Sequence, residues 1–208
     1  MTDEDLYIKS ITFFGSSKGT DGDPNYDAAR KVAKVVAASG RRVVNGGGSG
    51  TMLAATLGAK EGGGKTSVVY YKPEFATEFE GKEAFNHADQ HFEETNYIMR
   101  TKKLLELGDA YIVFNGGTGT LSEFAMAWGL ARLYFGHHKP LILYGAFWHH
   151  LMDDFKKYMI ARREEYQVFT IVTNGDEVMS AIDHYEKILH KNRHEHQKCS
   201  NAECHLLL

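Results

Sequence analysis

Short apolar runs alternate with helix-length segments along almost the whole chain, and this alternation constrains the fold more than any other feature. Each apolar run has the length of a β-strand, and the segment after it has the length of an α-helix. Repetition of this pair is typical of βα units around a parallel sheet. The sequence therefore predicts an α/β, Rossmann-like fold with a parallel sheet of about six or seven strands and helices on both faces.

The positions of these runs predict the individual elements. Strands are expected at residues 11–14, 42–45, 67–71, 110–114, 141–144 and 169–172. Helices are expected at residues 25–38, 51–61, 96–107, 121–134, 148–160 and 176–190. Residues 72–94 are polar and weakly periodic, which predicts either a lid or a connection containing a short strand.

Neither a linker nor an internal repeat divides the sequence, so we expect residues 1–190 to form a single domain. Residues 191–208 are rich in His, Lys, Asn, Gln and Glu, which predicts a disordered tail. The tail holds residue types that bind zinc, namely His194, His196, Cys199, Cys204 and His205. Their spacing matches no standard zinc finger, so we expect no metal site and keep zinc binding as the alternative.

Charge and hydropathy exclude several classes of protein. The chain has 24 Lys and Arg against 27 Asp and Glu, which disfavours broad binding to nucleic acid or to an anionic membrane. Its apolar runs are far shorter than the 18 or so residues of a membrane span. An acidic N-terminus and only two cysteines predict a cytoplasmic protein.

Many of the 21 glycines gather in three loops, each placed after a predicted strand. The loops are residues 15–19, 45–50 and 115–119. In a parallel sheet such loops open into one crevice, where helix N-termini offer N–H groups to anions. The first loop lacks the G-x-G-x-x-G spacing of nicotinamide-dependent dehydrogenases, and the third lacks the lysine of a Walker loop. The second loop either admits a ligand closely or is a tight turn.

The third loop is the most specific motif. It reads Asn115-Gly116-Gly117-Thr118-Gly119-Thr120 and leads into Glu123. A phosphate fits on the amides of residues 117–120 beside the Thr120 hydroxyl. Alternatively, Thr120 and Glu123 form a capping box that merely starts a helix. On the predicted helix before this loop, Arg100 lies on the shoulder of the buried face, where it either reaches the crevice or remains a surface charge.

Arg100, Asn115 and the Gly-Gly-x-Gly-Thr-x-x-Glu run resemble the LOG family of cytokinin-activating nucleoside 5′-monophosphate phosphoribohydrolases, often labelled possible lysine decarboxylases. The resemblance extends from about residue 8 to 183 and includes Phe14-Gly15-Ser16-Ser17 and the loop Gly46-Gly47-Gly48-Ser49-Gly50. It implies that Arg100 and Glu123 are catalytic. It also implies that the glycine loops hold the 5′-phosphate, through Ser16, Gly47, Gly48, Gly116, Gly117, Gly119 and Thr120.

This chain departs from the family motifs Met-x-x-Arg-Lys and Pro-Gly-Gly-x-Gly-Thr-x-x-Glu at two positions near the site. Asn115 replaces the Pro, and Thr101 replaces the Lys after the catalytic Arg, with Lys102 or Lys103 as candidate substitutes. The second loop resembles bacterial relatives, so AMP is expected as substrate ahead of a cytokinin nucleotide. The decarboxylase label lacks support, because such enzymes normally bind pyridoxal phosphate on a lysine.

The expected function is therefore hydrolysis of a purine nucleoside 5′-monophosphate to free base and ribose 5-phosphate, without cofactor. The alternative is a non-catalytic carrier of a nucleotide or of molybdenum cofactor, because related proteins use similar loops only to bind. An enzyme acting on nucleic acid is disfavoured by the charge. The helix at 121–134 is apolar on two faces, one with Phe124 and Trp128 and the other with Ala127 and Leu130, which predicts a homodimer or higher homo-oligomer with the site near the interface.

Overall fold

The computed structural model describes residues 6–72 and 85–196, and of residues 191–196 it describes the backbone alone. The strands are β1 (Ser10–Phe14), β2 (Arg42–Asn45), β3 (Thr66–Tyr71), β4 (Gln90–Glu94), β5 (Ala110–Val113), β6 (Leu141–Tyr144) and β7 (Phe169–Val172). The helices are α1 (Pro24–Ala38), α2 (Thr51–Glu61), α3 (Tyr97–Leu107), α4 (Thr118–Leu133), α5 (Phe147–Tyr158), the 3-10 turn η1 (Arg163–Tyr166) and α6 (Gly175–His196).

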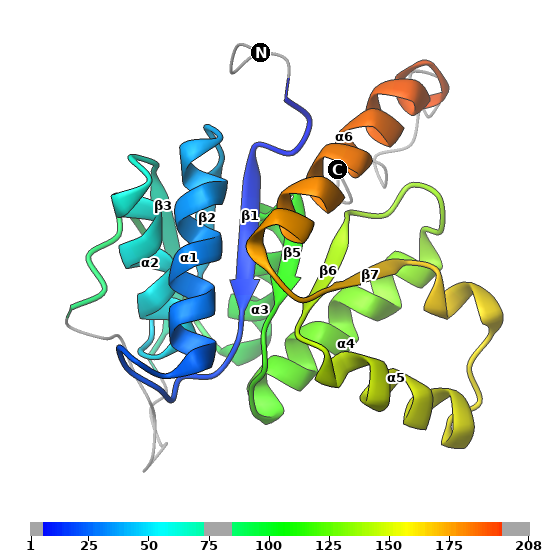
Figure 1. Ribbon diagram of the computed structural model, residues 1–208, viewed down its shortest axis with the longest axis horizontal. Helices are drawn as coiled ribbons and strands as arrows, with labels where there is room; N and C mark the ends of the chain where they lie inside the picture. The colour runs from blue at the N-terminus through cyan, green and yellow to red at the C-terminus, as the bar shows by residue number, and fades with distance from the viewer. Residues whose placement is uncertain (1–5, 73–84, 197–208) are drawn as a thin grey trace.

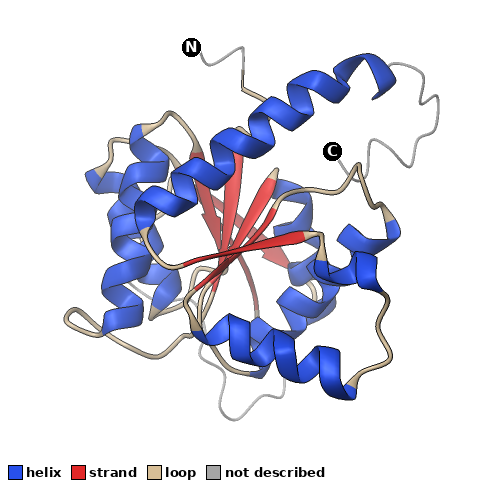
Figure 2. Cartoon of the chain, turned by 45° about the vertical axis from the view of Figure 1, so that its right-hand side comes forward, coloured by secondary structure: helices blue, strands red, loops and turns tan. Residues whose placement is uncertain are grey.

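The strands form one parallel sheet in the order β4-β3-β2-β1-β5-β6-β7. Helices α1, α2 and α6 cover one face, and α3, α4 and α5 cover the other (Figure 1). Figure 2 shows the twisted sheet between these layers. The predicted fold class and strand number are confirmed.

The central strands are apolar because both of their faces are covered. Every residue of β5 is buried, and Phe13 and Phe14 of β1 point into opposite helical layers. Burying one such side chain contributes roughly 1.5–3 kcal/mol to folding. Alternating side chains therefore tie each central strand to both layers.

Two boundaries differ from those expected by three residues or more. α4 begins at Thr118 instead of residue 121, and α6 continues to His196 instead of ending at residue 190. Within the polar stretch 72–94, residues 90–94 form the edge strand β4, while residues 73–84 lie outside the described part. Most of the predicted tail, residues 197–208, also lies outside it.

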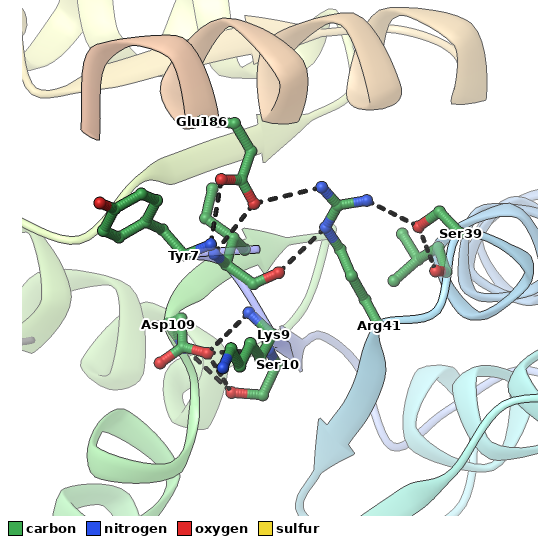
Figure 3. A network of polar contacts seen from close by, with 9 residues as sticks. Tyr7, Lys9, Ser10, Ser39, Arg41, Asp109 and Glu186 are labelled. Atoms are coloured by element: carbon green, nitrogen blue, oxygen red, sulfur yellow. Dashed lines mark hydrogen bonds and ion pairs between the residues drawn. The ribbon is translucent and has the colours of Figure 1, made fainter. Parts of the chain in front are cut away.

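A polar network holds the segment that leads into β1 (Figure 3). It lies at the amino ends of the strands, whereas the glycine loops lie at their carboxyl ends. The carboxylate of Glu186 on α6 accepts hydrogen bonds from the backbone N–H groups of Tyr7 and Ile8, at 3.1 and 2.9 Å. The same carboxylate pairs with Arg41 at 3.3 Å, and both side chains are buried. α6 is thereby joined to two neighbouring strands.

Among the described helices, none is long and apolar enough to span a membrane.

Candidate functional site

A cleft of about 390 Å³ opens at the carboxyl ends of β1 and β5. The order of the strands reverses between β1 and β5. From β1 the chain builds the sheet outward in one direction through β2, β3 and β4, and from β5 it continues in the other direction through β6 and β7. Ligands of open α/β sheets bind at such reversals. The cleft is lined by residues of all three predicted glycine loops, together with side chains from α2, β3, α3 and α4.

Backbone hydrogen bonds hold the three loops against one another. The N–H of Ser16 donates to the Asn115 carbonyl at 3.1 Å, and the N–H of Thr51 donates to the Ser16 carbonyl at 2.8 Å. The side-chain amide of Asn25 on α1 donates to Thr51 Oγ1 at 3.0 Å and to the Asn115 carbonyl at 3.3 Å. Gly50 has a positive φ of 58°, and a Cβ there would lie 2.4 Å from the Ser16 carbonyl. The loops thus form one connected floor.

The first turn of α4 presents to this cleft backbone donors that have no partner in the described part of the chain. Gly117 is the N-cap, and none of the described side chains caps the helix. The first intrahelical bond is donated by the N–H of Leu121 to the Gly117 carbonyl at 2.9 Å. The N–H groups of residues 117–120 therefore have no partner within the helix, and they lie at its positive end.

The capping-box interpretation of Thr120 and Glu123 is wrong. Thr120 lies in the first turn of α4 instead of preceding it, and Glu123 bonds to Arg100 instead of to the Thr120 backbone. Thr118 and Gly119 have low helix propensity, so the sequence places the helix start after them. They are nevertheless tolerated in the first turn, because the backbone N–H groups there need no partner within the helix.

Arg100 and Glu123 form a buried ion pair on the wall of the cleft. Arg100 Nη1 lies 2.8 Å from Glu123 Oε1, and the two side chains are 11% and 8% exposed. The remaining guanidinium nitrogens bond to protein as well, Nε to the Val69 carbonyl at 3.1 Å and Nη2 to the Gly46 carbonyl at 3.3 Å. A Cβ at Gly46 would lie only 1.7 Å from Nη2. Arg100 is therefore held by the second glycine loop, β3 and α4, and is no surface charge.

Burial raises the pKa of the Glu123 carboxyl above its ordinary value, and the Arg100 charge opposes this rise. The cause is the loss of water around the carboxylate, which disfavours its charged form. The single positive charge beside it offsets part of that cost. A buried carboxyl with a perturbed pKa and one charged partner in a cleft is typical of functional sites.

Five of the seven predicted phosphate-binding residues line the cleft. They are Ser16, Gly48, Gly117, Gly119 and Thr120. Gly47 and Gly116 are not among its lining residues. The N–H of Gly47 donates to Asn45 Oδ1 at 2.8 Å, and a Cβ at Gly116 would lie 2.1 Å from Thr120 Oγ1. These two glycines shape the loops without facing the cleft.

The two departures from the family motifs have clear structural settings. The carbonyl of Asn115 accepts hydrogen bonds from Ser16 and Asn25, so the loop is anchored without a proline. Thr101 is fully buried, and its hydroxyl has no hydrogen-bond partner among the described residues. The two candidate lysines do not line the cleft: Lys102 pairs with Glu106 at 3.3 Å, and Lys103 lies over the Phe92 ring at 5.3 Å.

Several lining residues were not predicted. These are Lys18 of the first loop, Met52 of α2, Tyr70 and Tyr71 at the end of β3, and Tyr97 of α3. Tyr70 and Tyr71 are the last residues of a predicted strand, so they lie at the same end of the sheet as the glycine loops. This position is the sequence signal that could have placed them at the cleft. They give the cleft an aromatic wall.

Known proteins of this fold differ in what they do. A molybdenum cofactor binding protein from Rippkaea orientalis has a TM-score of 0.64 and 21% identity, over 86% of this chain and 97% of that one. The molybdenum cofactor carrier protein from Chlamydomonas reinhardtii has a TM-score of 0.62 and 19% identity, over 88% and 99% of the two chains. DNA processing protein A from Helicobacter pylori has a TM-score of 0.55 and 14% identity, over 91% and 84%. At these identities the likeness shows the fold alone.

Sequence comparison identifies the family. No curated protein matches this sequence significantly. The family profile described as possible lysine decarboxylase matches residues 50–182, which contain Arg100, the third glycine loop and Glu123. The chain therefore belongs to the LOG family, the possible lysine decarboxylases.

Proposed function

We propose that this protein hydrolyses the N-glycosidic bond of a purine nucleoside 5′-monophosphate, with AMP as the first candidate substrate. The products are the free base and ribose 5-phosphate. The observation that carries the proposal is the buried Glu123 carboxylate, which pairs with Arg100 and lies one turn after the first turn of α4.

The first turn of α4 suits a phosphate group. Its free N–H groups point along the helix dipole, which favours an anion. A Cβ at Gly117 would meet nothing within 4 Å, so protein packing does not require glycine there. Glycine instead leaves room for a ligand to approach the backbone. Lys18 and Ser16 line the same cleft and add a positive charge and a hydroxyl.

Glu123 suits the chemistry of the glycosidic bond. Cleavage of this bond develops positive charge on the ribose, which a nearby carboxylate stabilises. The same carboxylate can accept a proton from the attacking water. Arg100 bonds to protein through all of its guanidinium nitrogens, so in this proposal it orients Glu123 and supports its charge. The C1′–N bond breaks as the C1′–O bond to water forms, the departing purine takes a proton from solvent, and Glu123 returns to solvent the proton that it accepted.

The second candidate is a carrier that binds a nucleotide or molybdenum cofactor without reaction. It is favoured by the solved structures of this fold that are described as molybdenum cofactor binding or carrier proteins. However, phosphate binding needs the helix amides and no carboxylate. A buried Glu beside those amides costs desolvation energy, and hydrolysis gives it a use.

The experiment that separates the two candidates is a panel of nucleoside 5′-monophosphates, incubated with purified protein and analysed by chromatography. The expected result is free base from AMP at a higher rate than from pyrimidine nucleotides, with ribose 5-phosphate in equal amount. Adenosine with free phosphate would indicate a phosphatase. Stable binding of a nucleotide or of molybdenum cofactor without cleavage would favour the carrier.

A further inference from the structure

Tyr97 contacts the helix that carries Glu123, although it lies on the helix that carries Arg100. Its hydroxyl lies 3.1 Å from the Gly119 carbonyl and 2.5 Å from Ser122 Oγ. Ser122 Oγ also donates to the Gly119 carbonyl, at 2.8 Å. The three groups form a small closed network between the N-terminal turns of α3 and α4.

The Tyr97 ring lies on the wall of the cleft, beside the ion pair. The guanidinium carbon of Arg100 lies 6.0 Å from the ring centroid, and the Tyr71 ring packs edge-on at 6.1 Å. The side chain therefore extends from the neighbourhood of Arg100 to the first turn of α4.

Two cross-links consequently join α3 to α4, about one helical turn apart. The first is Tyr97 to Gly119 and Ser122, and the second is Arg100 to Glu123. Tyr97 and Arg100 are three residues apart, which places them on neighbouring turns of the same helix face. The first cross-link holds the turn whose amides are free, and the second holds the carboxylate.

We propose that Tyr97 is a positioning residue, which fixes the anion-binding turn of α4 in relation to Glu123. The inference rests on the proposed function. A nucleotide whose phosphate is bound at residues 117–120 must also place its ribose C1′ against the Glu123 carboxylate. The rate then depends on the distance between the bound phosphate and the Glu123 carboxylate, and a misplacement of about 1 Å can lower the rate roughly a hundredfold.

The test is Tyr97→Phe, which keeps the ring and removes the hydroxyl. Tyr158→Phe, at a tyrosine that is 71% exposed, is the matched control. Tyr97→Phe is expected to lower kcat for AMP at least tenfold while the KM for AMP changes less than threefold. The control is expected to change neither value. An unchanged kcat, or a KM that rises as much as kcat falls, would overturn the positioning role.

Hydrogen exchange supplies a readout that needs no turnover. In the wild-type protein, the product ribose 5-phosphate, which is not consumed, is expected to slow amide exchange in the first turn of α4 and also at Arg100 and Thr101 of α3. In Tyr97→Phe the protection of α3 is expected to be lost. A wild-type protein that binds AMP without cleaving it contradicts the proposed function, and persistent α3 protection in the variant contradicts the role of Tyr97. No cleavage of AMP together with no protection by ribose 5-phosphate overturns both.

Discussion

At the scale of single residues, the site depends on one arginine whose guanidinium nitrogens all bond to protein. Carbonyl groups of β3 and of the second glycine loop hold the Arg100 guanidinium, and Glu123 takes its remaining strong contact. The sequence places Arg100 near the cleft through helical periodicity alone. It does not reveal these contacts, because they come from residues 31 and 54 positions away along the chain.

The pH dependence of catalysis should reflect Glu123. Because its pKa is raised by burial, activity that requires the carboxylate is expected to fall with decreasing pH at values above the ordinary 4.5. Removing the opposing charge with Arg100→Gln should raise this pKa further and move the acid limb of the kcat/KM profile to higher pH. An acid limb at the same pH in both proteins would contradict the assignment.

The same raised pKa has a defined effect on folding stability. Between the ordinary value and the raised one, the folded protein binds the proton more tightly than the unfolded chain does. The contribution of Glu123 to stability is therefore greatest below the ordinary pKa and declines as pH rises through the raised pKa.

Gly46→Ala should impair activity through Arg100. The added Cβ would lie 1.7 Å from Arg100 Nη2, so the guanidinium must move away from Glu123. Loss of about two orders of magnitude in kcat/KM is expected from such a displacement. Gly129→Ala is the control, because a Cβ there meets nothing within 4 Å. Full activity of Gly46→Ala would show that the position of the guanidinium is unimportant.

At the scale of secondary structure, each end of the sheet has its own polar contacts. The carboxyl ends of the strands carry the cleft, and the opposite edge carries the network of Arg41 and Glu186 (Figure 3). The second network connects α6 to β1 and to the start of β2. It stabilises the frame on which the loops are built.

Glu186→Ala should destabilise the protein by about 3 kcal/mol, because it leaves Arg41 buried without its partner. It also removes the acceptor of the Tyr7 and Ile8 amides. Asp183→Ala, at an exposed position one turn earlier on α6, is the control. Chemical denaturation measures the difference. Equal stabilities of the two variants would mean that the network contributes little.

The sequence predicts the apolar strands well, including the edge strand β7, and the polar edge strand β4 poorly. Buried strands such as β5 and β6 are recognisable because both faces are apolar. The polar stretch 72–94 predicts β4 only as one of two alternatives, because this edge strand is largely exposed and lacks an apolar pattern. The start of α4 was misplaced because its first turn is set by loop geometry, which local propensity does not encode.

At the scale of the whole molecule, α4 presents an apolar stripe outward while its other side packs on the sheet. The sequence assigns Phe124 and Ala127 to two different apolar faces, but both side chains are buried within the chain. The two predicted faces therefore overlap. Met126, Leu130 and Leu133 follow the i, i+4, i+7 spacing of a single helix face and are 38%, 36% and 65% exposed.

This stripe leads us to predict a homodimer that buries the outer face of α4. Light scattering at micromolar concentration should give twice the chain mass of 23.4 kDa. Leu133→Glu should return the mass to that of one chain, because a charge in a buried apolar interface is unfavourable. Ile188→Glu on α6 serves as the control. A wild-type mass of one chain would contradict the prediction.

The most direct test of the proposed hydrolysis compares the wild-type protein with Glu123→Gln on the nucleotide that is cleaved fastest. The substitution keeps the size of the side chain and removes its charge. The account predicts equal amounts of free base and ribose 5-phosphate from the wild type and a loss of at least two orders of magnitude in turnover for the variant, with a smaller change in nucleotide binding. Equal turnover by the two proteins, or no turnover by the wild type, would contradict it.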